Sequence, residues 1–174
     1  MNRKLFLYCS LFLALVSFYS CSKDDESYYP NTVIIDGQQF KINGGLLDKK
    51  IEWVGEKYYR AFDMVLYGGG IKLDDTRFSG EGFVLLARLY VTGTENYLDN
   101  GKYLFGVTPK PMTFSRIAYS ITFDVDSADN EPLIPLDAGS MSVTWENQHT
   151  IYFDVSNNSG TVLSGMYDGD MIIR

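Results

Sequence analysis

The chain is poor in the residues that most metal centres and many catalytic sites use. Among its 174 residues there is one histidine, His149, and there are two cysteines, Cys9 and Cys21. Histidine-rich zinc sites are therefore excluded by count. A Ser-His-Asp triad is arithmetically possible, but no Gly-x-Ser-x-Gly elbow accompanies the histidine. We therefore expect no metal, no cofactor and no enzymatic activity.

An excess of positive charge and long apolar runs are also missing. The chain has 15 Lys+Arg against 22 Asp+Glu, a net charge of −7, and so lacks the basic surface that binding to a phosphate backbone requires. Nucleic acid is not an expected partner. Beyond the N-terminus, no segment approaches the ~20 apolar residues of a transmembrane helix. The whole chain is 45% hydrophobic and long enough for one core.

The N-terminus has the pattern of a signal peptide that ends at a cysteine. A short basic start precedes an apolar stretch of 15 residues, Leu5–Tyr19, and Ser20 and Cys21 follow directly. This ending resembles the lipobox of bacterial lipoproteins, in which the cysteine is acylated and becomes the first residue after cleavage, although Phe18 stands where leucine is usual. The resemblance implies a lipid anchor at Cys21.

A short charged run follows this cysteine. Its residues are Ser22, Lys23, Asp24, Asp25 and Glu26. The run resembles the export signal of surface lipoproteins in Bacteroidetes, which implies a protein anchored in the outer membrane that faces the cell exterior and touches the membrane only through its lipid. A plain solvated tether also accounts for these charges. The chain then divides into a signal peptide at 1–20, a tether at 21–31 and a single β domain at 32–174.

From Thr32 onward the chain has the pattern of an all-β domain. Apolar residues alternate with period two, β-branched and aromatic residues are frequent, and Gly, Asn or Asp clusters recur at short intervals. We expect about nine or ten short strands, mostly antiparallel. Two architectures fit, a two-sheet sandwich and a closed up-and-down, lipocalin-like barrel, and the sandwich is preferred.

Alternation also assigns inward faces. The expected inward residues are Phe62, Met64 and Leu66; Ile117, Tyr119, Ile121, Phe123 and Val125; Met141, Val143 and Trp145; and Ile151, Phe153 and Val155. Trp53 is in phase with Ile51, so it is assigned to the core with Trp145. The segment Phe83–Val91 is apolar on both faces and is expected to be a central strand or a strand covered on both sides. Separate strands are expected at Gln39–Asn43 and Lys49–Val54.

The C-terminal segment contains Gly165, Tyr167 and Gly169 at alternate positions. This resembles the Gly-x-Tyr-x-Gly strand that closes the domain in a family of small Bacteroidetes surface lipoproteins, and it implies a fold and a location without an activity. The glycines lie in phase with Tyr167 and are expected to leave room for an aromatic ring from a neighbouring strand.

Three further polar features are candidate sites. His149 is expected in an exposed turn. The acidic segment Asp124–Glu131 either binds calcium or is a solvated loop, and it fails the EF-hand pattern because Ala128 replaces a ligand. Within it, Asp126-Ser127-Ala128 resembles an O-glycosylation acceptor of exported Bacteroides proteins, which implies a glycan on Ser127.

The 13 tyrosines suggest a ligand surface, because flat aromatic faces stack on sugar rings. The candidates are those on the apparently polar faces of strands, namely Tyr59, Tyr67, Tyr90 and Tyr152. Two functions remain open: a non-catalytic binding module for glycans or another small ligand, and a structural or adhesion module that contacts other envelope proteins. Hydrolysis by a carboxylate pair ranks third.

Overall fold

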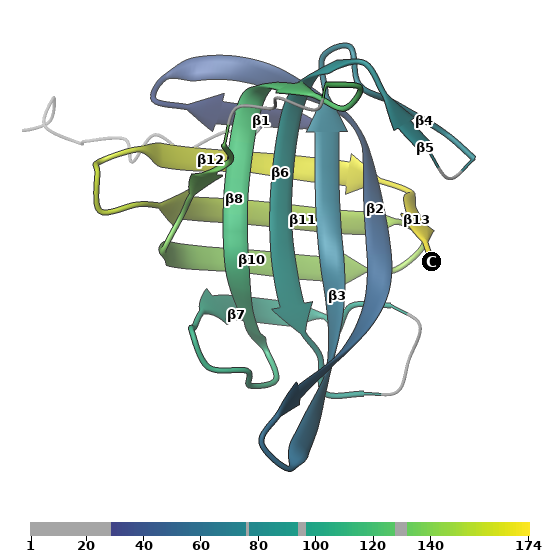
Figure 1. Cartoon of the computed structure of the whole chain (residues 1–174), viewed down its shortest axis with the longest axis vertical. Helices are drawn as coiled ribbons and strands as arrows, with labels where there is room; N and C mark the ends of the chain where they lie inside the picture. Colours follow the sequence, from purple (N-terminus) through teal and green to yellow (C-terminus); the bar gives the residue numbers. More distant parts are fainter. Residues whose placement is uncertain (1–28, 76, 94–96, 128–131) are drawn as a thin grey trace, which may run out of the picture.

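The computed structural model describes residues 29–75, 77–93, 97–127 and 132–174. The predicted lipid-modified Cys21 and the export residues Lys23, Asp24, Asp25 and Glu26 lie outside these ranges. All regular elements in the described part of the chain are strands (Figure 1). Accordingly, the described residues include no helix of the length and hydrophobicity needed to cross a membrane.

The strands are β1 (Thr32–Ile35), β2 (Gln38–Val54), β3 (Lys57–Gly68), β4 (Lys72–Asp74), β5 (Arg77–Ser79), β6 (Glu81–Tyr90), β7 (Gly101–Phe105), β8 (Thr113–Asp124), β9 (Ile134–Pro135), β10 (Ala138–Trp145), β11 (His149–Ser156), β12 (Val162–Gly169) and β13 (Met171–Ile173). Most neighbours are antiparallel; β7 pairs with β8, and β13 with β2, in parallel.

The large sheet closes on itself. Hydrogen-bonded pairing runs β1-β12-β11-β10-β7-β8-β6-β3-β2, and β2 pairs again with β1. Figure 1 shows two layers, with β8, β6, β3 and β2 in front running across β12, β11 and β10 behind. The all-β prediction is confirmed, and the structure combines the two packed layers of a sandwich with the closed circuit of a barrel.

The core lies between these layers and follows the predicted alternation over most of its length. On β3, β10 and β11, the inward residues Phe62, Met64, Leu66, Met141, Val143, Ile151, Phe153 and Val155 are all buried. The opposite positions on these strands are half-buried or exposed, apart from Ala61. A period-two pattern is therefore enough to place the two inner faces.

The predicted face of β8 is wrong beyond Tyr119. The pairing with β6 shifts register twice, and at the second shift Phe83 faces two residues of β8. Such a bulge inserts one residue and reverses which side chains point inward. Ile121 is consequently exposed, while Phe123 and Val125 lie on the outer face of the layer rather than in the core.

The prediction that β6 is covered on both faces is confirmed. Its inward residues Phe83, Leu85 and Leu89 are buried in the core, and on the outer face Val84 is only 5% exposed. The outer cover includes Ile71, just before β4, and Phe78 of the β4–β5 hairpin. Together with Val65, Tyr67, Val84, Leu86, Phe123 and Val125 they line an apolar slot of about 240 Å³.

The glycine prediction is confirmed at Gly165. A Cβ at this position would collide with the ring of Phe153 on β11 and with the backbone of Thr32 on β1. Gly165 therefore lets β12 pack between its two neighbours while an aromatic ring lies across it. At Gly169 the nearby ring is that of Tyr167 on the same strand.

Strand β2 is one strand of 17 residues, where two strands were expected. Its last residues extend past the barrel together with the start of β3, so that this hairpin projects beyond the layers (Figure 1). Trp53 lies there and is 67% exposed. The assignment of Trp53 to the core is wrong because no second layer of described strands reaches this part of the sheet.

Candidate functional site

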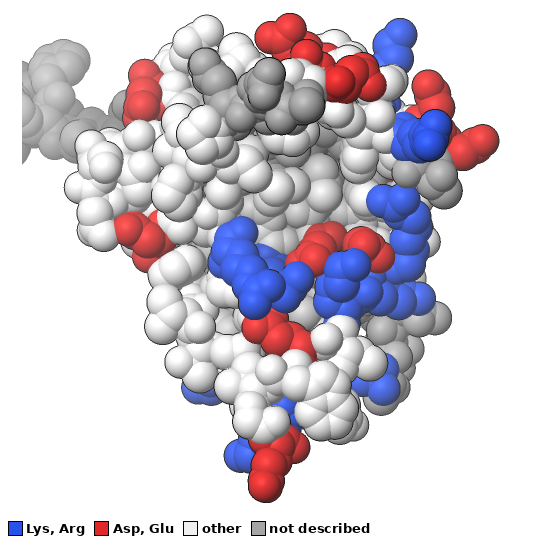
Figure 2. Space-filling model, viewed as in Figure 1, with Lys and Arg blue, Asp and Glu red and all other residues white. Residues whose placement is uncertain are grey.

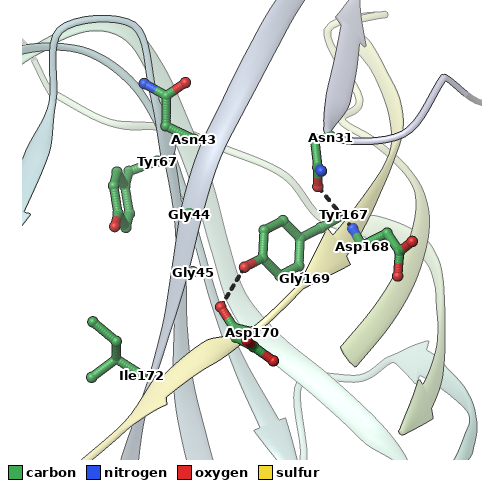
Figure 3. A pocket seen from close by; sticks show the side chains of 10 residues that line it. All are labelled: Asn31, Asn43, Gly44, Gly45, Tyr67, Tyr167, Asp168, Gly169, Asp170 and Ile172. Atoms are coloured by element: carbon green, nitrogen blue, oxygen red, sulfur yellow. Dashed lines mark hydrogen bonds between the residues drawn. The ribbon is translucent and has the colours of Figure 1, made fainter. Parts of the chain in front are cut away.

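A polar pocket lies where β2, the end of β3 and the β12–β13 corner meet (Figure 3), and we call it the end pocket. Its volume is about 290 Å³. Side chains that can form hydrogen bonds line it from several elements: Asn31, Asn43, Tyr67, Tyr167, Asp168 and Asp170. Four of these six are neutral, so the pocket suits a ligand with several hydrogen-bonding groups.

A bulge in β2 shapes one wall. The pairing of β2 with β3 shifts register between Ile42 and Gly44, which leaves Asn43 as the extra residue. The Asn43 amide nitrogen donates to the carbonyl oxygen of Gly69 at 2.9 Å. Gly44 has no side chain, and a Cβ there would collide with the hydroxyl of Tyr67. The glycine thus allows the Tyr67 ring to lie against the backbone of β2.

The β12–β13 corner forms the opposite wall. The hydroxyl of Tyr167 donates to the carbonyl oxygen of Asp170 at 2.6 Å and fixes the corner. The backbone nitrogen of Asp168 donates to the Asn31 side-chain oxygen at 2.9 Å, which ties the start of β1 to the end of β12. Both bonds are drawn in Figure 3. The corner then leads into β13, which pairs with Gly45–Leu47 of β2.

Both tyrosines of the end pocket keep their protons at neutral pH. Burial raises the pKa of Tyr67. Burial also raises the pKa of Tyr167 to about 12, and the neighbouring Tyr67, Asp170 and Asp168 add to the effect. Within the described part of the chain, the Tyr67 hydroxyl makes no hydrogen bond. It therefore offers a neutral hydroxyl that can both donate to and accept from a ligand.

A second hollow adjoins the end pocket at Asp168, which lines both. This outer groove has a volume of about 540 Å³ and lies on the β10–β11 hairpin. Gln148 and Thr150 donate to the same oxygen of Asp168, at 2.8 Å and 2.9 Å. These two bonds hold the carboxylate in place between the two hollows.

The four tyrosines proposed as ligand-stacking residues do not share one surface. Tyr67 lines the end pocket, and Tyr152 lies on the outer face of β11, 39% exposed and next to Thr150 of the outer groove. Tyr59 and Tyr90 pack edge to face on the other layer. Tyr90 is only 2% exposed, so its ring has no open face.

The predicted exposed turn at His149 is wrong. His149 begins β11, points into the barrel and is 2% exposed, and its Nε2 atom has no hydrogen-bond partner in the described structure. Trp145 is half-buried, so its assignment to the core is also wrong, and its ring stacks flat on Tyr97 at a centroid distance of 4.4 Å. The rings of Trp145 and His149 also touch, with centroids 5.9 Å apart.

Ser127 is half-buried directly after β8, and its backbone nitrogen donates to Asp124. Its glycosylation stays a prediction. The second half of the acidic segment, Ala128–Glu131, lies outside the described residues. Within the described ranges, no group of three or more His, Cys, Asp or Glu side chains is arranged to hold a metal ion.

Sequence reasoning missed a charged cluster on the outer face of the front layer. Arg88 donates to both carboxylate oxygens of Asp63 and to Glu52, which also accepts from Arg116 and Tyr90. Figure 2 shows charged side chains gathered in a band across the middle of this face. No single segment could have revealed the cluster, because β2, β3, β6 and β8 each contribute to it.

The residues of the end pocket left a fainter trace in the sequence. Asn43-Gly44-Gly45 interrupts an apolar pattern, which is the usual mark of a bulge or of a close backbone approach. Asp168 and Asp170 flank the second glycine of the closing strand.

Comparison with known proteins adds no relative: no family model, no curated protein and no solved structure matches the chain.

Proposed function

We propose that this protein is a non-catalytic binding module and that the end pocket takes a small, hydroxyl-rich ligand such as one sugar unit of a glycan. The observation that carries the proposal is the convergence of an uncommitted tyrosine hydroxyl, two amides and two carboxylates on one pocket. Such a set pairs with vicinal hydroxyls, each of which is both a donor and an acceptor.

The size of the end pocket supports a small ligand. A volume of about 290 Å³ lies at the lower end of the range of about 300–1,000 Å³ that is typical of ligand pockets. The outward rim includes Asp170 and Ile172, which are exposed. A longer chain of sugar units can therefore leave the pocket at its rim without unfolding either wall.

The electrostatics favour a neutral or cationic ligand. Among the described residues that line the end pocket, Asp168 and Asp170 are charged and none is a lysine or arginine. A phosphate or carboxylate ligand would meet two negative charges there with no cation to offset them. In this proposal the protein is displayed through the predicted lipid anchor at Cys21, and it captures ligand at the outer surface of the cell.

A binding screen with matched variants tests the proposal. The purified full chain is applied to a glycan array, and each hit is measured by isothermal titration calorimetry. Asn43→Ala and Tyr67→Phe are compared with the native chain. Tyr67→Phe removes one hydroxyl and keeps the ring, so we expect a loss in affinity of about five- to tenfold, the effect of one hydrogen bond of about 1 kcal/mol.

Tyr152→Phe is the control, because it makes the same change on the outer face of β11. The proposal requires Tyr67→Phe to weaken binding and Tyr152→Phe to leave it within twofold. Equal affinity of the native chain and Tyr67→Phe for every hit would exclude the end pocket. A folded native chain that binds no glycan would exclude the sugar ligand.

A further inference from the structure

The β2–β3 hairpin has a projecting end that pairs with no other strand among the described residues. On the β2 side, the last described backbone contact is with Arg174, which exchanges hydrogen bonds with Leu47 and Lys49. On the β3 side, pairing with β6 ends at Ala61. The segment 51–60 beyond these points is a two-stranded ribbon that projects from the barrel (Figure 1).

One face of this ribbon is apolar and exposed. Ile51 is 63% exposed, and the cross-strand pair Trp53 and Tyr58 is 67% and 57% exposed. The two aromatic rings touch, with centroids 5.6 Å apart. Val54 at the turn is 44% exposed. Burying such side chains is favourable, and a contiguous exposed group of them usually marks an interaction site.

Positive charges flank the apolar residues on the side toward the barrel. Lys49 precedes Ile51 by two positions and so shares its face, and Arg60 lies directly opposite Ile51. At the turn, Lys57 and the acidic Glu56 are both exposed. The acidic Glu52 points to the other face, where Arg88 and Arg116 bind it. From tip to barrel, the apolar face therefore passes from aromatic and aliphatic side chains to cations.

We propose that the tip of this hairpin, Ile51–Tyr58, docks into an anionic lipid surface. Aromatic side chains partition to the boundary between lipid headgroups and acyl chains, and lysine or arginine beside them pairs with lipid phosphates. The chain as a whole carries a charge of −7, whereas Lys49 and Lys57 place cations beside the tip. A projecting, convex tip also suits a deformable lipid layer.

The fluorescence of Trp53 tests this docking in the full chain. The sequence has two tryptophans, so Trp145→Phe leaves Trp53 as the single tryptophan. Vesicles contain phosphatidylcholine with or without phosphatidylglycerol, and a second set carries brominated acyl chains. We expect a blue shift of Trp53 emission and quenching by bromine with the anionic vesicles. Because bromine quenches only at short range, this readout reports the hairpin itself even if the N-terminus also binds lipid.

Charge and apolar variants in the same Trp145→Phe background sharpen the result. Lys49→Gln and Lys57→Gln should each lower the ratio of docked to free Trp53 by about fivefold, since each lysine near an anionic surface contributes about that factor. Ile51→Ser with Tyr58→Ser should abolish quenching. Asn43→Ala, at the other end of β2, should leave it unchanged.

Two results would overturn the proposal. The first is Trp53 emission that is identical with and without anionic vesicles. The second is a blue shift that depends on protein concentration and not on lipid, which would identify a second copy of the chain as the occupant. Neither result bears on ligand binding in the end pocket, so this inference and the proposed function fail independently.

Discussion

The two ends of β2 differ although they belong to one continuous strand. At the end-pocket end, Gly44 and Gly45 are buried between β3 and β13 and leave no room for a side chain. At the hairpin end, Ile51 and Trp53 are large, apolar and exposed. The exposure of Ile51 and Trp53 runs against the usual pattern, because large apolar side chains are mostly buried.

The difference follows from what lies beside and behind each half of the strand. Up to Leu47, β2 has a neighbour on each edge and the back layer behind it, so even small residues there are enclosed. Past Lys49, β3 is the only described strand that still pairs with β2. Burial is therefore set by the layers around a strand, and the same alternation that fills a core in one half produces an exposed apolar face in the other.

The largest effect on the free energy of unfolding is expected at Leu47, in the enclosed part of β2. Leu47 is fully buried in the core, so Leu47→Ala should lower the free energy of unfolding by about 2–5 kcal/mol. Ile51→Ala, four residues further along the same strand, removes a side chain that is mostly solvated and should change it by no more than about 0.5 kcal/mol. Urea unfolding followed by circular dichroism measures both. Similar losses would mean that the hairpin end is packed.

The charged cluster between the two ends should give the next effect. Arg88→Met leaves Asp63 without its partner and removes one of the donors to Glu52, in side chains that are mostly shielded from solvent. We expect a loss of about 2 kcal/mol in the free energy of unfolding. Urea unfolding at pH 7 is the measurement.

The control for Arg88→Met is Arg116→Asn, because Arg116 bonds the same Glu52 from an exposed position and asparagine tolerates the positive φ of Arg116. An exposed ion pair is worth little, so this change should cost less than about 1 kcal/mol. If both substitutions cost the same, the shielding of the cluster contributes nothing to its strength.

A smaller effect should appear as pH dependence through His149. Burial lowers the pKa of His149, and the charge of Asp170 opposes the shift in part. The unfolded chain then binds a proton more readily than the folded one. The free energy of unfolding is therefore highest above the ordinary pKa of 6.5, and it decreases as the pH falls from there toward the lowered pKa of the folded state. His149→Phe should remove this loss.

Thermal unfolding at a series of pH values between 7 and 5 measures the difference between the native chain and His149→Phe. Phenylalanine is close in shape and leaves no unbonded nitrogen in the core, so the two proteins should be similar at pH 7. The variant should become the more stable one as pH falls. Parallel profiles for the two proteins would show that His149 is not responsible.

Sequence patterns predicted the parts of this fold that depend on one strand at a time. Alternation placed Met64, Phe153 and Val143 inward, and the glycine spacing predicted the ring that crosses Gly165. Alternation failed at Phe123, because the bulge that reverses the inward face of β8 arises from its pairing with β6. It also failed at Trp53, because alternation identifies the apolar face and does not tell how far the opposite layer extends.

The candidate site was harder to predict for the same reason. Tyr67 was identified as a ligand residue from its place on an apparently polar face, and it does line the end pocket. Asn31 precedes β1, Asn43 is the bulge residue of β2 and Asp168 lies near the end of β12, so the three meet only when these strands are in register. Only the interruption of the apolar pattern at Asn43-Gly44-Gly45 marked one of them.

The smallest effect on the free energy of unfolding is expected at the hairpin tip, where a small value separates a role in folding from a role at the surface. Trp53→Ala removes the largest exposed side chain of β2, which contacts Tyr58 across the ribbon. An exposed cross-strand aromatic pair contributes about 0.2–1 kcal/mol, so the free energy of unfolding should fall by less than 1 kcal/mol. Urea unfolding is the measurement, and a loss above about 2 kcal/mol would mean that Trp53 supports the fold. A small loss would mean that this apolar face does little for stability, as the proposed contact with a surface outside the molecule requires.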